Sequence, residues 1–324
     1  MRVRGLGRTG ISVSELTIGT ATLAAGRDPV EASAALALAL ERGINAIEID
    51  AGDRATVGLL RAALAREGAR NRVHVLARVP TLVPFDLPSP HVPAQQAYPG
   101  RHIRVETEAL LRTLGVERLA LQQLHGWCPE WLDEGDWRET LERLRDEGKI
   151  AGFGISLFDH DVDAGLEAVA SGAIDSVEVM YNLFDQGAAA ALLPLCRQHA
   201  VAAIVRSPLY FGALAPSPGG GMRTFPREDW RRAYFFDAHR QETEARTREL
   251  AGRVQLPDRS LPDLALRFSL SHPAISTVAV GMHTRPQVEA NVQAIRHAPL
   301  DAEKHASLAE HGWLCSRSHG AGLA

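Results

Sequence analysis

Short apolar runs alternate with longer segments of helical period along the whole chain. The runs with the length and composition of strands are ELTIG (15–19), INAIEID (44–50), VHVLARV (73–79), LALQQLH (119–125), AGFGIS (151–156), SVEVMYN (176–182), AAIVRSPL (202–209) and STVAVG (276–281). Segments with apolar residues at helical spacing follow them, at about 30–42, 57–68, 105–115, 137–149, 162–172, 188–199, 259–272 and 285–295. Eight strand-then-helix units predict a parallel sheet, and that number predicts closure into an α/β fold of the (β/α)8 TIM barrel type.

No break in composition divides the chain, so we expect residues 1–324 to form a single barrel domain. Two segments interrupt the alternation. Residues 79–100 are rich in proline, and residues 213–237 combine a glycine tract with an arginine–aromatic stretch. Both follow the ends of predicted strands, so both should lie over the mouth of the barrel. We expect at least one of them to form a lid or a substrate wall; the alternative is ordinary surface loop.

The composition argues against several other kinds of protein. The chain has 324 residues, 45% of them hydrophobic, and a formal net charge of −4, so no surface for nucleic acid is expected. Its three cysteines are far apart, which argues against disulfides or a thiolate metal site and favours a reducing compartment. The N-terminus has no signal-peptide core, and no apolar run of membrane-spanning length follows. We expect a cytoplasmic protein with a small-molecule partner, no metal and no membrane; its oligomeric state stays open.

Three carboxylates gather at the end of the second predicted strand. In INAIEIDAGDRA, Glu48 and Asp50 share one face of the strand because side chains alternate along it, and Asp53 follows them. No base or phenol accompanies them in this stretch. Their chemistry therefore depends on partners from other strands.

The residues of these units, taken in order, closely resemble the aldo-keto reductases. The similar phrases are GLGRTGISVSELTIGT, GIN, LRTLG, LQQLH, DEGKIAGFGIS, MYNLFD, RSPLYFGAL, LALRFSLSHPAISTVAVG and QVEANVQA, and they extend over essentially the whole chain. The resemblance implies an eight-stranded barrel that binds NADP(H) in an extended form and transfers a hydride to a carbonyl group. A shared fold does not guarantee a shared function, so each residue of the family's site must be compared with the residue at that position in this chain.

The resemblance also implies that much of the dinucleotide site is present. VGMHTRPQVEAN is similar to the segment that holds the phosphate and adenine end, where a loop enters a helix whose N–H groups face an anion. There, His283 and Arg285 would bind a 2′-phosphate. The other residues assigned in this way are Gly19, Thr20, Ser207, Leu209, Gly212, Thr284, Gln287 and Asn291, with Tyr181 stacked under the nicotinamide. NADP(H) is the expected cofactor, NAD(H) is the alternative, and use of the barrel without a dinucleotide stays open.

The nicotinamide end departs from the family's pattern. The Ser-Asn pair after the fifth strand reads Ser156-Leu157 here, and the glutamine three residues before the Tyr-Asn pair is Glu178. Both lost groups ordinarily hold the carboxamide of the nicotinamide, and a leucine offers that amide no hydrogen bond. Because hydride transfer depends on the position of the ring, this loss would misplace it, although Glu178 would still accept a hydrogen bond from the carboxamide.

The catalytic tetrad of the family, an aspartate, a tyrosine, a lysine and a histidine, is incomplete. His125 matches the histidine, and Arg78 stands where the lysine belongs. An alignment without gaps places Glu48 at the aspartate, whereas a shift of two residues would choose Asp50. The tyrosine position is then Asp53 or, after the shift, an alanine, so the phenol is missing. Arg78 and Glu48 would form an ion pair, which by itself donates no proton to an alkoxide at neutral pH.

Other side chains are candidates for the missing proton donor. His125, an imidazole at a strand end, suits general acid–base work near neutral pH, and a purely binding role is its alternative. Asp53 would donate a proton if burial kept its carboxyl protonated. Tyr98 and Tyr210 lie in loops that follow strands and would reach the substrate at the barrel mouth. Trp127 is expected to wall the substrate pocket.

These observations leave three functions open. The first is a diverged NADP(H)-dependent oxidoreductase that acts on a small carbonyl or alcohol, with His125 or Asp53 handling the proton. The second is a non-redox lyase, dehydratase or isomerase on the same scaffold, favoured by the joint loss of the tyrosine and the carboxamide ligands. The third is a binding or sensing protein for the dinucleotide. We favour the first because several positions of different chemistry agree on a dinucleotide site.

Overall fold

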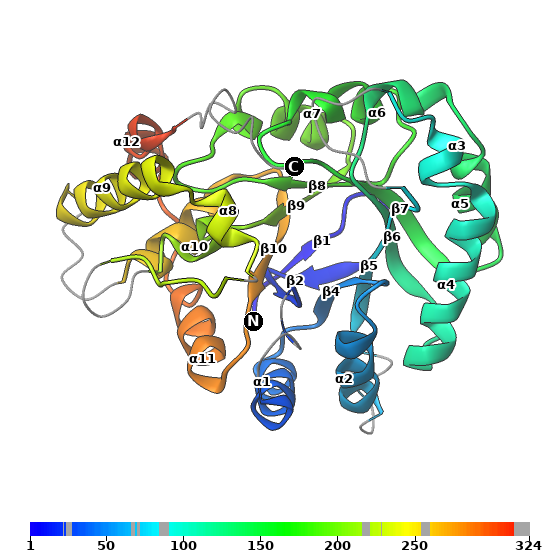
Figure 1. Ribbon diagram of the computed structural model, residues 1–324, viewed down its shortest axis with the longest axis horizontal. Coiled ribbons are helices and arrows are strands. Elements are labelled where there is room, and N and C mark those ends of the chain that lie inside the picture. Colours follow the sequence, from blue (N-terminus) through cyan, green and yellow to red (C-terminus); the bar gives the residue numbers. More distant parts are fainter. Residues whose placement is uncertain are drawn as a thin grey trace.

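Eight parallel strands close into a barrel in the order β10-β3-β4-β5-β6-β7-β8-β9, which confirms the predicted (β/α)8 fold. The computed structural model of the protein describes residues 1–21, 23, 28–65, 69, 72–83, 91–215, 221–227, 229–253 and 260–313. The barrel strands are β3 (Leu16–Gly19), β4 (Ala46–Asp50), β5 (His74–Val79), β6 (Leu119–His125), β7 (Ile150–Ser156), β8 (Ser176–Met180), β9 (Ala202–Arg206) and β10 (Ile275–Gly281). Figure 1 shows these strands inside a ring of helices.

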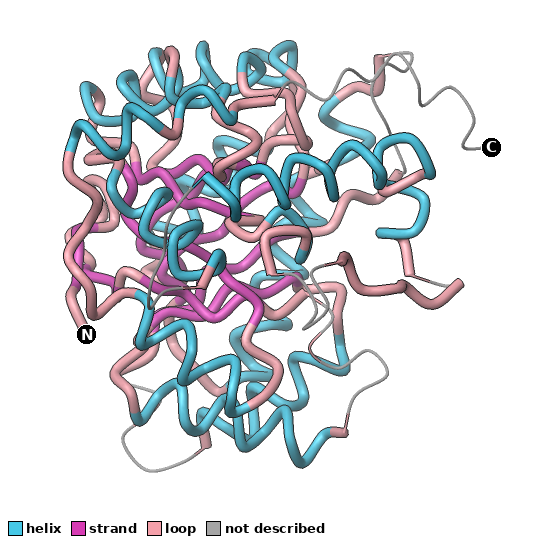
Figure 2. The backbone as a smooth tube through the Cα atoms, turned by 90° about the vertical axis from the view of Figure 1, so that its left-hand side faces the viewer, coloured by secondary structure: helices cyan, strands magenta, loops and turns pink. Residues whose placement is uncertain are grey.

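Helices cover the outside of the barrel because they bury an apolar face against the strands. Those that follow the barrel strands are α1 (Pro29–Glu41), α2 (Arg54–Leu64), α4 (Gly100–Leu114), α5 (Trp137–Asp146), α6 (Leu166–Ala170), α7 (Leu192–Gln198), α10 (Leu261–Ser271) and α11 (Arg285–Ala294). Helix α4 begins earlier than its apolar spacing predicts and ends at Gly115, whose φ of 68° gives the left-handed conformation of a helix stop. Figure 2, a view turned by 90°, shows helices on both sides of the strands.

A short hairpin closes the amino-terminal end of the barrel. Its strands, β1 (Val3–Gly5) and β2 (Ser12–Ser14), pair antiparallel around the turn predicted at LGRTGIS. The fully buried Leu6 packs against the lowest apolar layer of barrel side chains. Gly7 has a φ of 53°, and a Cβ there would lie 2.6 Å from the amide nitrogen of Ala202. A glycine is therefore required for the hairpin to approach the barrel this closely.

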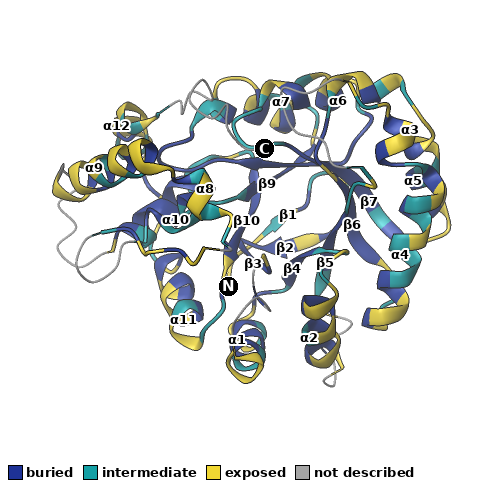
Figure 3. Ribbon diagram, viewed as in Figure 1, coloured by how far each residue is buried: buried dark blue, intermediate teal, exposed yellow. Residues whose placement is uncertain are grey.

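Alternation of side chains along the strands decides which residues face the inside of the barrel. On β4 the parity of Glu48 and Asp50 points both inward, and the register places Asp50 beside Arg78 of β5. Above the apolar layer, the barrel interior is polar, because Gln123 of β6 and Glu178 of β8 are both fully buried. Figure 3 shows that the strands are buried while the surrounding helices expose their outer faces.

Further helices lie outside the eight units. In the described part of the chain they are α3 (Ala94–Ala97), α8 (Arg231–Tyr234), α9 (Asp237–Arg253) and α12 (Ala302–Ser307). Helix α9 has no apolar stripe to predict it from sequence; ion pairs one turn apart, such as Arg246 with Glu242 at 2.7 Å, lie along it. Parts of the two interrupting segments, 84–90, 216–220 and residue 228, fall outside the described residues. None of the helices in the described ranges is long and apolar enough to span a membrane.

Candidate active site

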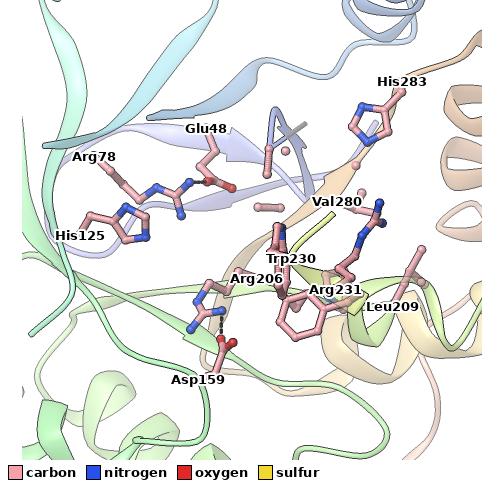
Figure 4. A pocket seen from close by; sticks show the side chains of 18 of the residues that line it. Glu48, Arg78, His125, Asp159, Arg206, Leu209, Trp230, Arg231, Val280 and His283 are labelled. Carbon is pink, nitrogen blue, oxygen red and sulfur yellow. Dashed lines mark hydrogen bonds and ion pairs between the residues drawn. The ribbon is translucent and has the colours of Figure 1, made fainter. Parts of the chain in front are cut away.

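A cavity of about 740 Å³ lies at the carboxyl-terminal ends of the barrel strands. Its walls include Gly19 of β3, Arg78 of β5, His125 of β6, Arg206 of β9 and Gly281 of β10. The cavity is therefore at the end of the barrel opposite the hairpin, where (β/α)8 enzymes place their active sites. Figure 4 shows side chains from these separate strands converging on the same space.

A group of buried charged side chains forms one part of the cavity wall. Nη2 of Arg78 lies 2.7 Å from Oε1 of Glu48, and Nη1 donates to Oε1 of Glu178 at 3.1 Å. Gln123 donates through Nε2 to the other Glu178 oxygen at 2.9 Å. Glu48 and Arg78 line the cavity, whereas Glu178 lies beneath them with no exposed surface. Arg78 thus joins two carboxylates through its planar fork, which a lysine does not possess.

The burial of this group changes its protonation. Loss of hydration raises the pKa of Glu48 to about 7, because the attraction of Arg78 does not fully offset that loss and the repulsion by Glu178. Burial by itself would lower the pKa of Arg78. The attraction of the two carboxylates is the stronger effect, and it raises the pKa of Arg78 above its ordinary value. Arg78 therefore stays cationic, while Glu48 carries a proton about half of the time near neutral pH.

His125 reaches the cavity with a carboxylate behind it. Its Nδ1 lies 3.1 Å from Oδ2 of Asp50, whose other oxygen accepts the Gly52 amide at 2.8 Å. Burial disfavours the charged Asp50, but the hydrogen bonds from His125 and Gly52 outweigh it, and the pKa of Asp50 is lowered. An ionised Asp50 accepts the Nδ1 proton, so the ring turns Nε2 toward the cavity as the atom available to a ligand.

The structure corrects the expectation that Asp53 handles a proton. Asp53 is the N-cap of α2, and its oxygens accept the Thr56 amide at 3.0 Å and the Thr56 hydroxyl at 2.6 Å. Its side chain is not part of the cavity lining. Asp53 therefore stabilises the first turn of a helix, a role for which aspartate is among the preferred residues.

The two tyrosines expected at the barrel mouth are not part of the cavity lining. Tyr98 is buried, its hydroxyl donates to the backbone carbonyl of His125, and burial raises its pKa well above the ordinary value. Tyr210 is buried as well, and its hydroxyl lies 3.1 Å from Nε2 of His239. Neither phenol lines the cavity. The structure therefore corrects both assignments: these residues support the walls from behind.

Two further aromatic assignments are corrected by burial. Trp127 is 1% exposed and packs edge-to-face between Trp131 and Trp137, with ring centroids 6.0 and 5.3 Å away. Tyr181 stands on the outward side of β8, where its ring stacks on Phe268 at 5.3 Å. Neither lines the cavity. Tyr181 follows the inward-facing residue Met180, so strand parity directs it toward the helices.

Arg206 is a cavity residue that the sequence analysis missed. It ends β9, and its guanidinium pairs with the Asp159 carboxylate and donates to the Leu157 carbonyl at 2.8 Å. Figure 4 shows Arg206 and Asp159 paired with each other in the wall of the cavity. The signal was an arginine directly after the apolar run AAIV, at the carboxyl end of a strand.

Aromatic side chains form another wall. Phe211 and Trp230 lie edge-to-face with ring centroids 4.8 Å apart, and the Arg231 guanidinium lies 4.5 Å from the centroid of Phe225. All four residues line the cavity, and three of them belong to the interrupting segment 213–237. Phe211 has a φ of 54°, an uncommon conformation for a residue with a side chain. Strain of this kind gathers at functional sites.

The residues assigned to the dinucleotide divide into two sets. Those that line the cavity are Gly19, Ser207, Leu209, Gly212, His283 and Gln287. Those that do not are Thr20, Ser156, Glu178, Tyr181, Thr284, Arg285 and Asn291. Thr20 donates to the Glu48 carbonyl at 2.9 Å, and Thr284 caps α11 in a capping box with Gln287. Figure 4 shows His283 across the cavity from His125, so the cavity extends between these two side chains.

The chain's own groups fit a dinucleotide at both ends of this site. At one end α11 begins, and the exposed Arg285 at its first position offers a guanidinium; Pro286 has no N–H, and the Gln287 N–H is bound to the Thr284 hydroxyl. At the other, Ser156 lies beside His125 in the strand register, behind the cavity lining, and its buried hydroxyl has no hydrogen-bond partner among the described residues. Leu157 is 2% exposed, and a Cβ on Gly165 would lie 3.0 Å from it. Leu157 is part of the cavity lining as well as of the core, and its side chain adds no polar ligand there.

Among the described residues, no group of three or more histidine, cysteine, aspartate or glutamate side chains is placed to hold a metal ion. A sequence model described as the aldo/keto reductase family matches residues 15–312. The chain is 28% identical over 316 residues to uncharacterized oxidoreductase YqkF of Bacillus subtilis (strain 168), with 96% of each chain covered.

Two further relatives extend this likeness. NADH-specific methylglyoxal reductase of Escherichia coli (strain K12) is 27% identical over 212 residues, which are 62% of this chain and 61% of the relative. Among solved structures, the holo form of aldo-keto reductase AKR11C1 from Bacillus halodurans superposes with a TM-score of 0.75 and 27% identity, covering 99% of each chain.

Proposed function

This chain belongs to the aldo/keto reductase family, and from that premise we propose that it is a diverged NADP(H)-dependent oxidoreductase. It transfers a hydride between the dinucleotide and a small carbonyl or alcohol substrate, and its proton donor is a group other than tyrosine. The observation that carries this proposal is the two-ended cavity. Acid–base groups stand at one end and a helix N-terminus with His283 stands at the other. Its volume of about 740 Å³ falls in the ordinary range of small-molecule and cofactor sites.

The preference for NADP(H) rests on the side chains of His283 and Arg285 at the start of α11. His283 lines the cavity just before the helix, and Arg285 opens its first turn. Both are suited to the extra phosphate that distinguishes NADP(H) from NAD(H), because arginine and protonated histidine donate charge-assisted hydrogen bonds. NAD(H) is the alternative, and a relative from Escherichia coli is named as NADH-specific.

The polar end of the cavity would hold the substrate oxygen. When bound, the dinucleotide supplies or accepts the hydride. His125, oriented by Asp50, directs Nε2 at the oxygen of the carbonyl or alcohol. The Arg78 charge stabilises negative charge that develops on that oxygen. Phe211 and Trp230 exclude water from the apolar side of the substrate.

A second function, a non-redox lyase, dehydratase or isomerase on the same scaffold, is favoured by one observation. The side chain after Ser156 is the core residue Leu157, which holds no carboxamide. A protein of this kind would bind its substrate in the cavity without any dinucleotide.

The test is a titration with NADPH and NADH, followed by tryptophan fluorescence and calorimetry. Trp230 lines the cavity and is 50% exposed, so it is the expected reporter in place of Trp127. We expect saturable quenching by NADPH, and Trp230→Phe should lose the quenching but keep the binding heat. Arg285→Ala should weaken NADPH binding by roughly tenfold and leave NADH unchanged, since a charged hydrogen bond contributes about that much.

The outcomes separate the candidate functions. Absence of saturable heat with either dinucleotide at millimolar concentration would contradict the oxidoreductase and favour the cofactor-free alternative. Tight binding without turnover of any carbonyl or alcohol would favour a sensing role. Saturable binding together with turnover supports the proposal.

A further inference from the structure

We infer that Glu48 is the group that delivers the proton to the substrate oxygen during reduction and takes it back during oxidation. The inference rests on the proposed function and assigns the role left vacant where the family carries a tyrosine. Three features of the described residues support it. Glu48 lines the cavity, the charges around Arg78 do not cancel, and Glu178 accepts more hydrogen bonds than Glu48 does.

Glu48 stands where a proton can reach a ligand. It faces inward from β4, it lines the cavity, and it is 5% exposed. Figure 4 shows Glu48, Arg78 and His125 together on one side of the cavity, with the Arg78 guanidinium directed at the Glu48 carboxyl. Glu178 is fully buried and is not part of the lining. Of the two carboxyl groups bound to Arg78, Glu48 is therefore the one that a ligand can touch.

The charges around Arg78 do not cancel if both carboxyl groups are ionised. One guanidinium then faces two carboxylates inside the barrel, and the group carries one excess negative charge. Two more charged groups act on Glu48, Arg206 by attraction and Asp50 by repulsion. Each of these has its own partner, since Arg206 pairs with Asp159 and Asp50 contacts His125. Gln123, the other polar side chain bound to Glu178, is neutral. An uncompensated charge in a buried site is unfavourable, so the group favours the uptake of one proton.

Hydrogen bonding places that proton on Glu48. Each oxygen of Glu178 already accepts an N–H bond, one from Arg78 and one from Gln123. Glu48 forms an ion pair with Arg78 through Oε1, and no hydrogen bond to its other oxygen is seen among the described residues. That oxygen is free to hold a proton and donate it into the cavity. The pKa of Glu48, raised to about 7 by burial, agrees with this placement.

The step balances without any further reactant. In reduction the substrate carbon gains the hydride from the bound dinucleotide, and the substrate oxygen takes the proton from the Glu48 carboxyl as its O–H bond breaks. The resulting Glu48 carboxylate stays paired with Arg78 until it regains a proton from water at the cavity mouth. His125 donates or accepts a hydrogen bond at the same oxygen and positions it.

The first test needs no cofactor and no turnover. Infrared difference spectra of the cofactor-free protein should show a protonated-carboxyl band that disappears as the pH rises through about 7. Glu48→Gln should lack this band, whereas Asp53→Asn should keep it. Asp53→Asn is the matched control, since an asparagine also caps a helix and Asp53 lies outside the cavity lining. A band that persists in Glu48→Gln overturns the inference.

The second test is the pH profile of carbonyl reduction. In the wild type the rate should fall as the pH rises through about 7, because only the protonated Glu48 donates. Glu48→Gln should lower kcat by roughly 100-fold or more and abolish that limb, while the Kd for NADPH stays within about threefold. Glu48→Asp, which keeps an acid, should restore part of the rate.

The outcomes also separate the inference from the proposed function. Retention of the pH limb in Glu48→Gln, or its loss in His125→Asn with Glu48 intact, would assign the proton to another group and overturn the inference. Failure of the wild type to bind NADPH contradicts the proposed function, and it does so independently of the infrared band.

Discussion

At the scale of single residues, Arg78 and Glu48 link stability to pH. The pKa of Glu48 is raised in the folded protein from an ordinary 4.5 to about 7. Between pH 4.5 and about 7, Glu48 is therefore protonated in the folded protein and ionised in the unfolded chain. The stabilisation that this difference gives the folded state is fully present below the ordinary pKa of 4.5. That contribution, on the order of 3 kcal/mol, is lost as the pH rises through about 7.

Removal of the guanidinium should therefore cost more at high pH. In Arg78→Met, two buried carboxyl groups lose their cation, and the free energy of unfolding should fall by about 3–5 kcal/mol at about pH 8. At about pH 5.5 the loss should be smaller, because Glu48 is then protonated and one buried charge is removed. Urea unfolding at the two pH values measures the difference. Arg206→Met is the control, since its partner Asp159 is partly exposed and can hydrate. Equal losses at both pH values for Arg78→Met would argue against a buried charge at Glu48.

At the scale of secondary-structure elements, a polar network fastens α8 and α9 to the loops at the barrel mouth. His160 contacts Asp185 through Nδ1 at 2.6 Å and the Tyr234 hydroxyl through Nε2 at 2.9 Å. Tyr234 donates to the Tyr210 hydroxyl at 3.2 Å, and Tyr210 lies 3.1 Å from Nε2 of His239. These residues come from the loops after β7, β8 and β9 and from both helices. The network therefore holds the aromatic wall in place.

Tyr234→Phe tests this attachment. Loss of the hydroxyl removes two contacts of the network, so the free energy of unfolding should fall by about 1–3 kcal/mol. Hydrogen exchange should become faster at amides of α8 and α9 and stay unchanged in β4 and β5. Arg232→Ala, an exposed change on the same helix, is the control and should leave exchange unaltered. Unchanged protection in Tyr234→Phe would mean that packing alone holds these helices.

At the scale of the whole molecule, the barrel has a structural end and a chemical end. The hairpin with Leu6 and Gly7 closes one end, and the cavity lies at the other. One set of side chains thus stabilises the fold, and a separate set forms the site. Changes at the hairpin should affect stability without altering ligand affinity.

Leu6→Ala is the corresponding prediction. Truncation of a fully buried side chain should lower the free energy of unfolding by about 2–5 kcal/mol. The Kd for NADPH of the folded protein, measured by calorimetry at a temperature where the variant is native, should equal that of the wild type. A weakened Kd in the native variant would show that the two ends of the barrel are coupled.

The sequence predicted the barrel because its signals are local. Apolar runs of strand length and helical spacing recur eight times, and each unit can be read without knowledge of its neighbours. Helix α9 escaped prediction because its few apolar residues form no stripe, and ion pairs, buried Leu250 and contacts such as that of His239 with Tyr210 hold it in place. The resemblance to the aldo-keto reductases singled out Glu48, Arg78 and His125, and all three line the cavity because the carboxyl ends of parallel strands meet at one mouth.

What the sequence alone determined, then, is the barrel and the residues that end its strands. Only the tertiary structure decided which of those residues act together. Strand parity turned Tyr181 away from the cavity, and packing buried Trp127. Register and closure brought Asp50 to His125, and Glu178 to Arg78. The protonation of a carboxyl group depends on its burial and on charges from distant strands, which no local pattern records.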